Sequence, residues 1–382
     1  MNFLKGELFN GPGGLALGAK NARFIHPDTG EEFKIEHLWS NDYDDTACET
    51  YKKNICENEN DQSVHVGPVE NLPIGDKSKL GDIDCLAFGF PCNDYSNVGK
   101  KVGINGEFGP LYSYGVEVLE LYQPKFFVAE NVGGLQNSNE GKTFIKILTE
   151  LQNAGYQITP HLYKFEQYGI PQARHRIIIV GIRNDLAEKG IEFKVPAPLV
   201  ISSTEYTTSS QAIMEPPIQD GCPNHEMTNH TKKVKEMLSY IPAGENAWYP
   251  GIPEHLQLKV KGARLSSIYK RLDPNRPAYT VTGSGGGGTH MYHWTEPRSL
   301  TNRERARLQT FPDNFIFYGS KEAVRQQVGM AVPPKGAEII FNAILKTFAG
   351  ITYESVEPLA KLQLVNLTGK NHASKELTKL NI

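Results

Sequence analysis

Hydrophobic and polar positions alternate in blocks along the first 190 residues, where short apolar runs are separated by stretches of helical periodicity. The apolar runs predict strands at the start of 6–22 and within 33–42, 82–91, 124–135 and 174–183. The helical periodicity predicts helices at the end of 6–22 and within 109–123 and 142–156. This alternation is typical of an α/β fold with a mostly parallel sheet and helices on both faces.

The pattern changes at about Pro196, where proline, serine and threonine become frequent. We therefore expect four segments: a first domain over 1–194 that is completed by 320–350, a second, less regular domain over 195–297, a connecting helix region over 298–319, and a polar tail over 351–382. Ser299 or Thr301 is expected to cap the connecting helix, because both have a hydroxyl that can accept from its first turn.

The composition is ordinary for a globular protein, with 39% hydrophobic and 22% charged residues in a chain of 382. No apolar run reaches the roughly 18 residues that span a membrane, and the N-terminus lacks the signature of a signal peptide. The five cysteines show neither paired spacing nor a C-x-x-C. We therefore expect no membrane, no disulfide framework and no metal site, and the reducing cytoplasm as the location.

The charge is distributed unevenly, although the net charge is only −3. Residues 225–307 contain 13 basic and seven acidic side chains, a balance of +6. Such a segment fits a region that binds a polyanion, but the same count fits charges scattered over solvated faces. Charge alone leaves both interpretations open.

Polar residues follow the predicted strands, and in parallel sheets ligands bind beyond the carboxyl ends of the strands. The glycines of "FNGPGG", residues 9–14, follow the first strand and suit either a nucleotide site or a tight structural turn. Asp42 ends the second strand, where an acid can hold ribose hydroxyls. Phe9 and Tyr43 offer flat faces on which a base can stack.

Cys92 follows the third strand and opens a polar loop, whereas Cys85 lies inside the strand and reads as a small buried hydrophobe. A cysteine at such a strand end can be a nucleophile of low pKa. Glu130, at the end of the next strand, can be a partly buried acid that hydrogen-bonds a substrate. Gln172, Arg174 and Arg176 alternate into the last strand, which places all three side chains on one face.

Six ordered blocks carry a resemblance that spans residues 9 to about 334: "FNGPGG", "GFPCNDYS", "ENVGGL", "QARHR", "RSLTNRERARLQTFPDNF" and "VGMAVPP". The chain resembles the bacterial and phage cytosine-5 DNA methyltransferases. The resemblance implies a Rossmann-like class I methyltransferase domain over 1–194 and a smaller, irregular target-recognition domain over 195–297. It also implies S-adenosylmethionine as cofactor and a DNA (cytosine-5-)-methyltransferase activity.

The resemblance also implies roles for the chemical residues. Cys92 would attack C6 of cytosine, so that C5 becomes carbanion-like and accepts the methyl group. Glu130 would hydrogen-bond N3 and the amino group, and Arg176 would hold O2 with Arg174 in support. The cofactor positions are expected to be Phe9, Gly11, Gly13, Gly14, Asp42, Tyr43 and Pro91.

Cytosine C6 is out of reach inside a duplex, so the base must be flipped out at a cost of about a few kcal/mol. The substrate implied is double-stranded DNA, with phosphate contacts and base readout supplied in part by the second domain. The DNA-contact residues expected are Ser96, Gln172, Lys261, Arg264, Lys270, Arg271, Gly285, Gly286 and Gly287.

Two positions depart from the family pattern: Pro68 stands where an acid near the cofactor adenine is expected, and Met330 replaces an asparagine. The chain begins at the first block, an arrangement that resembles a restriction–modification or phage enzyme. We expect a monomer, and the one protein partner considered is a cognate endonuclease that acts separately. A transfer-RNA methylase of the same family is the alternative. A non-catalytic DNA-binding protein and a Rossmann dehydrogenase leave more of the motifs without a role.

Overall fold

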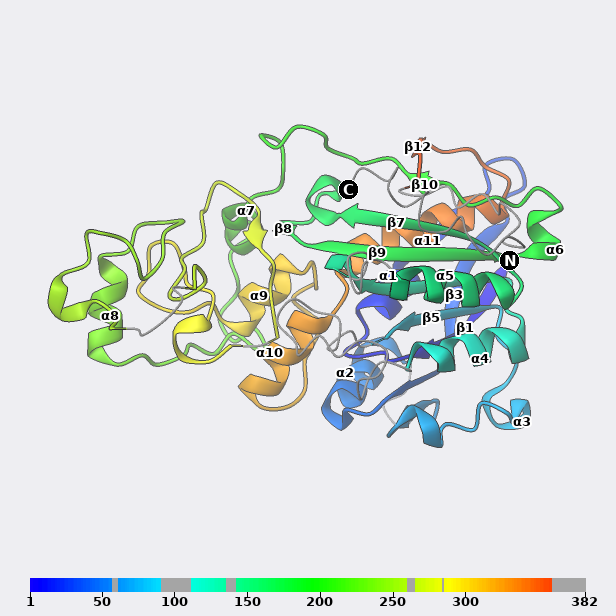
Figure 1. The fold of residues 1–382 in the computed structure, drawn as a ribbon, viewed down its shortest axis with the longest axis horizontal. Coiled ribbons are helices and arrows are strands. Elements are labelled where there is room, and N and C mark those ends of the chain that lie inside the picture. Colours follow the sequence, from blue (N-terminus) through cyan, green and yellow to red (C-terminus); the bar gives the residue numbers. More distant parts are fainter. Residues whose placement is uncertain (57–60, 91–110, 135–141, 260–264, 284, 359–382) are drawn as a thin grey trace.

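The computed structural model describes residues 1–56, 61–90, 111–134, 142–259, 265–283 and 285–358. Its main sheet has the strand order β2-β3-β1-β5-β6-β9-β7, with β4 paired to β3 (Figure 1). The strands are β1 (Asn2–Leu8), β2 (Arg23–Ile25), β3 (Glu32–Asp42), β4 (Val64–Val66), β5 (Cys85–Gly89), β6 (Phe126–Val132), β7 (Tyr156–Lys164) and β9 (His175–Arg183). The five predicted strands are confirmed as β1, β3, β5, β6 and β9.

The sheet is parallel from β4 to β6, and β9 then runs antiparallel between β6 and β7. Strand β7 was not predicted, because its sequence "YQITPHLYK" mixes polar residues and a proline into the apolar pattern. It pairs with β9 along its whole length, which returns the chain toward the same sheet edge. The mostly parallel α/β fold is therefore confirmed, with two strands, β2 and β9, running against the others.

Helices cover both faces of this sheet. On one face, α4 (Tyr112–Tyr122) and α5 (Lys142–Asn153) bury apolar side chains with Trp39, Phe88 and Phe127. On the other face, α1 (Gly14–Asn21) and α11 (Pro334–Phe348) pack together over Phe3 and Phe126. The late helix of the chain therefore belongs to the core of the first lobe.

The remaining helices border the sheet or build the second lobe. They are α2 (Asp45–Ile55), α3 (Lys77–Leu80), α6 (Asn184–Ala187), α7 (Ser209–Met214), α8 (Lys232–Ser239), α9 (Asn302–Leu308) and α10 (Lys321–Met330), with single 3-10 turns η1 (Val69–Asn71), η4 (Phe165–Tyr168), η5 (Glu254–Leu256) and η6 (Gly287–Thr289). Thr301 caps α9 in a capping box with Glu304, so the second of the two expected caps is used.

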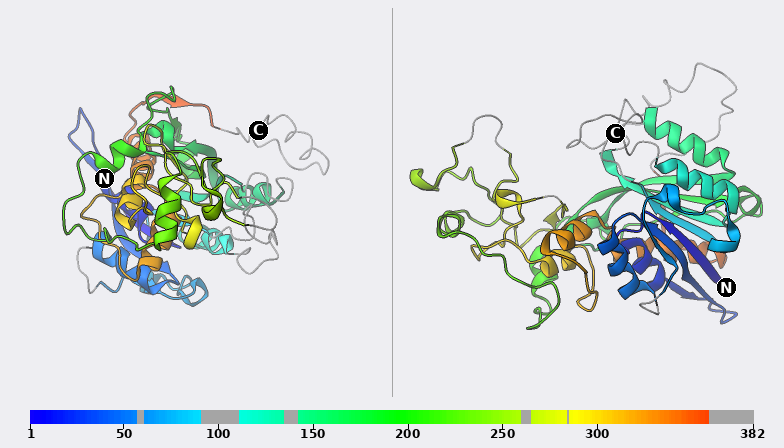
Figure 2. Two further views of the ribbon diagram at one scale, coloured as in Figure 1. Left: turned by 90° about the vertical axis from the view of Figure 1, so that its left-hand side faces the viewer. Right: turned by 90° about the horizontal axis from the view of Figure 1, so that it is seen from below.

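The second lobe stands beside the sheet lobe and is joined to it through α9 and α10 (Figures 1 and 2). It holds little regular structure and has a small core of its own around Met237, Leu238 and Tyr292. The short strands β8 (Gln172–Ala173) and β11 (Ala278–Tyr279) pair in parallel and connect the two lobes. A last pair, β10 (Val195–Pro196) and β12 (Ser355–Val356), brings the end of the described chain back to the sheet lobe.

Candidate active site

An ion pair lies at the edge of the sheet where β6 and β9 are neighbours. Arg176, the second residue of β9, lies opposite Val132, which is two residues after Glu130 on β6. Its Nε lies 2.9 Å from Glu130 Oε1, and the two side chains are only 13% and 12% exposed. Arg176 Nη1 also donates to the carbonyl of His175 at 2.8 Å. Period two in both strands thus brings together the acid and the arginine that the sequence singled out.

Burial and the neighbouring charges act on Glu130 in opposite directions. Burial raises the pKa of the Glu130 carboxyl, and the nearby charges of Arg176 and Arg174 counteract this only in part. Burial also lowers the pKa of the Arg174 guanidinium well below its ordinary value, with Arg176 adding repulsion. A buried acid that gains a proton easily can donate a hydrogen bond as well as accept one.

The end of β5 is fixed against the same pair. Gly89 lies opposite Glu130 in the β5–β6 register, and a Cβ at Gly89 would lie 3.3 Å from Glu130 Oε2. Asn131 Nδ2 donates to the carbonyl of Phe90 at 3.2 Å. Sequence reasoning missed both residues, although "ENV" carries Asn131 beside the acid. Together they fix the end of β5 against Glu130 and Asn131.

The residues that follow this strand, among them Pro91, Cys92 and Ser96, lie outside the described residues. Two of the cysteines that the structure describes have thiols unsuited to attack. Burial raises the pKa of Cys48 to about 12 and that of Cys56 to about 11. Cys85 is 1% exposed inside β5, as expected for a small buried hydrophobe.

The glycine turn after β1 is held by Asp42. Gly11 N donates to Asp42 Oδ2 at 2.8 Å, and Asp44 N donates to Asp42 Oδ1 at 3.0 Å. Phe9, Gly11 and Gly13 all have positive φ angles of 56°, 50° and 95°, so the turn uses backbone conformations that favour glycine. Burial raises the pKa of Asp42, while these backbone donors favour its charged form.

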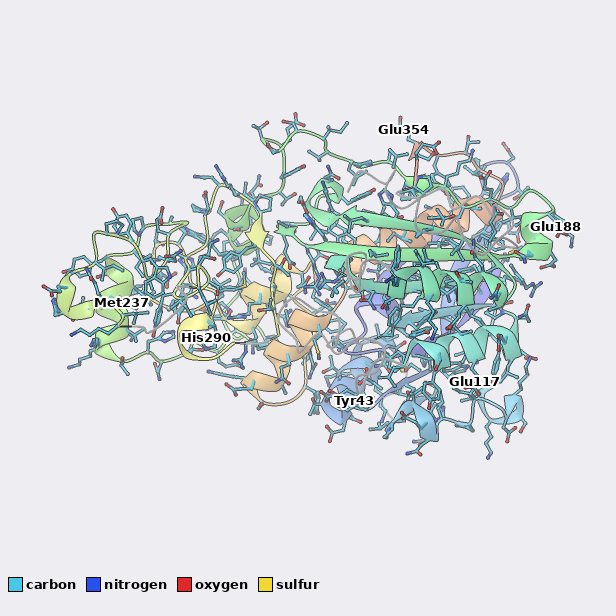
Figure 3. All side chains as sticks on the ribbon, in the orientation of Figure 1. Tyr43, Glu117, Glu188, Met237, His290 and Glu354 are labelled. Atoms are coloured by element: carbon cyan, nitrogen blue, oxygen red, sulfur yellow. The ribbon has the colours of Figure 1, made fainter. Side chains whose placement is uncertain are left out.

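This turn fits a nucleotide-like cofactor. A Cβ on Gly11 would meet nothing within 4 Å, so its backbone borders open space, whereas Gly14 packs directly against Val332. A carboxylate has about four acceptor positions, and each Asp42 oxygen accepts one backbone bond, which leaves capacity for ribose hydroxyls. Tyr43 is 71% exposed and lies beside α2 (Figure 3), where its ring can face an adenine.

A buried polar cluster below the turn was not predicted. Lys5 and Glu7, both 1% exposed, pair on β1, and Tyr51 OH donates to Glu7 Oε2 at 3.0 Å. A Cβ on Gly13 would lie 3.1 Å from Tyr51 Cδ2, so the cluster supports the glycine turn directly. Two charges in the strand "NFLKGEL" were the only signal in the sequence.

Comparison with known proteins identifies the family of the chain. The family model described as C-5 cytosine-specific DNA methylase matches residues 3–346. The chain belongs to the C-5 cytosine-specific DNA methylase family. It is 59% identical over 360 residues to the type II methyltransferase M.BbvI of Brevibacillus brevis, covering 93% of this chain and 94% of that protein. It is 40% identical to M.NgoFVII of Neisseria gonorrhoeae, covering 93% and 90%.

Solved structures confirm the fold of this DNA methylase. A putative DNA modification methyltransferase encoded within an Escherichia coli prophage superposes with a TM-score of 0.63 at 22% identity, covering 91% of this chain and 99% of that one. The predicted family, the class I methyltransferase fold and the DNA (cytosine-5-)-methyltransferase activity are thereby confirmed. A dehydrogenase and a non-catalytic DNA-binding protein have no support from these relatives.

The methylase's Gln172 and Arg174 are internal. Gln172 is 0% exposed, donates to Gln309 Oε1 at 2.8 Å and accepts from Val281 N at 2.7 Å. Arg174 Nη1 and Nη2 donate to the carbonyls of Val281 and Gly329, each at 3.0 Å. These bonds argue against the expected contact between Gln172 and DNA, because its polar atoms already bind protein groups. Both side chains instead tie the sheet to the second lobe.

Arg271 is likewise placed differently from the expectation. It is 4% exposed, and its guanidinium donates to the carbonyls of Leu238, Ile241, His293 and Glu296 at 2.7–2.8 Å. A guanidinium that gives four of its five donors to backbone carbonyls organises the second lobe and keeps at most one donor for a phosphate. The basic excess of 225–307 therefore overstates the charge that this segment offers to DNA.

The other expected DNA contacts lie on the surface or outside the described residues. Gly286 and Gly287 are exposed, Gly285 and Gly287 have φ angles of 136° and 53°, and Tyr292 OH donates to the carbonyl of Gly287 at 2.8 Å. Lys270 lies with Nζ 5.0 Å from the ring centre of Tyr279. Lys261 and Arg264 are not among the described residues.

Both departures from the family pattern are at the surface of the methylase. Pro68 is exposed ahead of η1, and Met330 is 56% exposed at the end of α10, where its carbonyl accepts from Arg174 at 3.4 Å. Throughout the described ranges, we find neither a helix able to cross a bilayer nor a group of three metal-ligating side chains.

Proposed function

We propose that this enzyme methylates C5 of a cytosine flipped out of a short specific sequence in duplex DNA, with S-adenosylmethionine as the methyl donor. The Glu130–Arg176 pair, held at the carboxyl edge of the sheet that also carries the turn at Gly11, is the observation that carries this proposal. Relatives named type II methyltransferases support a role in restriction–modification, with a cognate endonuclease acting separately. A cytoplasmic monomer belongs to the same proposal.

The pair at Glu130 suits recognition of a cytosine edge. A protonated Glu130 carboxyl donates to N3 and accepts from the 4-amino group, and the raised pKa of Glu130 supports this form. Arg176 turns from the carboxylate to O2, where it stabilises negative charge that develops on the ring. Base entry therefore replaces one buried ion pair with hydrogen bonds to the substrate.

Cys92 supplies the nucleophile in this proposal. Its thiolate adds to C6, the C5–C6 double bond opens, and the electron pair reaches C5, with charge delocalised toward O2 and N3. After C5 has gained the methyl group, the C5 proton leaves to a base, the double bond re-forms and the thiolate departs. The fixed end of β5 at Gly89 and Phe90 supports the delivery of Cys92 to this position.

The cofactor is held at the turn below β1 and β3. S-adenosylmethionine supplies an electrophilic methyl group on a sulfonium centre. Gly11 and Gly13 allow the backbone to approach it, Asp42 accepts from its ribose hydroxyls, and Phe9 and Tyr43 flank its adenine. The positive φ angles of the turn and the spare acceptor capacity of Asp42 support this arrangement.

Expression in a host without cytosine methylation, followed by bisulfite sequencing of the host DNA, tests the function. Protected cytosines in one short recurring context are expected, and they should vanish with Cys92→Ser at equal expression. Complete conversion in the presence of folded wild-type protein would refute a DNA substrate. Transfer RNA from the same cells would then be sequenced, since a transfer-RNA methylase is the remaining candidate within the same chemistry.

A further inference from the structure

Five arginines of the described chain are almost fully buried: Arg174, Arg271, Arg303, Arg305 and Arg307. Four of them donate at least three hydrogen bonds each to carbonyl or carboxylate oxygens. Arg305, which is 2% exposed, differs: within the described residues its guanidinium has a single long contact, 3.4 Å from Nη2 to His290 Nδ1. A buried charge without oxygen partners is costly, so this guanidinium calls for a ligand.

Arg305 lines a cavity of about 170 Å³ between α9, α10 and the segment that follows η6. Arg325 lines the same cavity; its Nε is buried without a hydrogen-bond partner, and its Nη1 is 3.7 Å from Glu322 Oε1. The other charged groups at the cavity are Lys321, whose Nζ donates to the carbonyl of Met227 at 2.9 Å, and the exposed Glu226 and Glu322.

The buried wall of the cavity is therefore positive. Burial lowers the pKa of Arg305 to about 10, and the positive charge of Arg325 acts on it in the same direction. Burial, together with Arg305 and Arg325, lowers the pKa of His290 to about 4, so this imidazole is neutral at pH 7 and can accept from Arg305. Both carboxylates sit at the exposed rim, where solvent screens them.

We propose that this cavity binds a phosphate of the DNA backbone between Arg305 and Arg325. A phosphodiester presents oxygen acceptors to Arg305, whose one contact is with His290, and to Arg325, whose Nε has no partner and whose Nη1 has only the 3.7 Å approach of Glu322. The cavity also adjoins the segment proposed to contact DNA, because His290 directly follows η6 and lies in the second lobe (Figure 3). The same segment packs on α10, since a Cβ on Gly283 would lie 2.9 Å from the carbonyl oxygen of Gln326.

The test measures DNA affinity against salt for the wild type, Arg305→Met, Arg325→Gln and the double variant, with Arg23→Gln as control. Arg23 is an exposed arginine on β2 at the opposite edge of the sheet, with its Nη1 3.6 Å from Glu32 Oε1. Losing one phosphate contact should make the slope of log Kd against log salt shallower by about 0.9 in the double variant. Target and unrelated DNA should weaken equally, because a phosphate contact carries no sequence information.

An unchanged slope in folded double variant would overturn the proposal. A second measurement compares phosphate with chloride at equal ionic strength. If phosphate raises the melting temperature of the wild type but not of the double variant, and the slope of log Kd for DNA against log salt is unchanged, the cavity binds a free anion and the DNA assignment is wrong. If Arg305→Met fails to fold, the slope of log Kd against log salt for Arg325→Gln alone tests the proposal. The inference uses the DNA substrate of the proposed function, but binding needs no turnover, so a failure of methylation would be recognised separately.

Discussion

Gly329 on α10 offers a sharp test of how the two lobes are joined. A Cβ at this position would overlap the backbone atoms Gly283 N and Thr282 C, which cannot rotate away as a side chain can. Gly329→Ala must therefore push α10 away from the glycine segment, and overpacking of this kind costs about 1–3 kcal/mol. The same shift displaces the carbonyl that accepts from Arg174, and a hydrogen bond to a charged group contributes roughly 1.5–3 kcal/mol. We expect a total destabilisation of about 3–5 kcal/mol.

Thermal unfolding of Gly329→Ala beside Gly75→Ala measures this effect. Gly75 is exposed, and a Cβ on it would meet nothing within 4 Å, so the control adds the same methyl group without a clash. The melting temperature of Gly329→Ala should fall by roughly 4–6 °C, since an unfolding entropy of about 2.1 cal/mol/K per residue gives about 1.2 °C per kcal/mol for a chain of 382 residues. DNA affinity should fall as well. Equal melting temperatures for the two variants would refute the close packing of α10 on the second lobe.

Three further outcomes test the site. Cys92→Ser should reduce methylation by at least about a thousandfold while DNA binding stays within about threefold; residual turnover well above about a thousandth of the wild-type rate would remove Cys92 as nucleophile. Glu130→Gln should lower kcat about 10²–10⁴-fold. Because burial raises the folded-state pKa of Glu130, the stability that this group contributes to the wild type is present below pH 4.5 and is lost as pH rises. In urea unfolding from pH 5 to 8, the free energy of unfolding of Glu130→Gln should therefore rise relative to that of the wild type. A difference that stays constant over this range would contradict the prediction. Gly11→Ala should raise the KM for S-adenosylmethionine, because φ is 50° there and an alanine is strained by about 1–2 kcal/mol; an unchanged KM would separate this turn from the cofactor.

Local patterns predicted the elements that bury one continuous apolar face. Strand β6 was readable from "PKFFVAENVGGL" because its buried residues are contiguous, and the acid at its end marked the site. Strand β7 could not be predicted in this way, because Pro160 and His161 interrupt its apolar pattern. Its pairing with β9 depends on the tertiary structure and leaves no local signal in the sequence. Helix α2 was also missed, although Asp44 caps it and its moderately polar sequence borders the cofactor turn.

Charge was the least reliable guide in the sequence. Composition predicts that an arginine is a cation at the surface. Arg271 and Arg303 instead donate hydrogen bonds to backbone carbonyls in the interior. The reason is physical: a lobe with little regular structure leaves many carbonyls without backbone donors, and a guanidinium has five donors on one planar group. Arg305 sits in the same helix as Arg303 without such partners, and only the structure separates the two roles.

The alternation of "QARHR" connects the chemistry to the junction of the lobes. Gln172 of β8, Arg174 between β8 and β9, and Arg176 of β9 bind in turn Gln309 at the C-cap of α9, Gly329 of α10 and Glu130 of the active site. A shift of α10 or α9 on DNA binding must therefore act on the backbone that carries Arg176, only two residues from Arg174. Since packed interiors respond to such shifts as units rather than yielding locally, the position of Arg176 beside Glu130 depends on how α9 and α10 are seated against the sheet lobe.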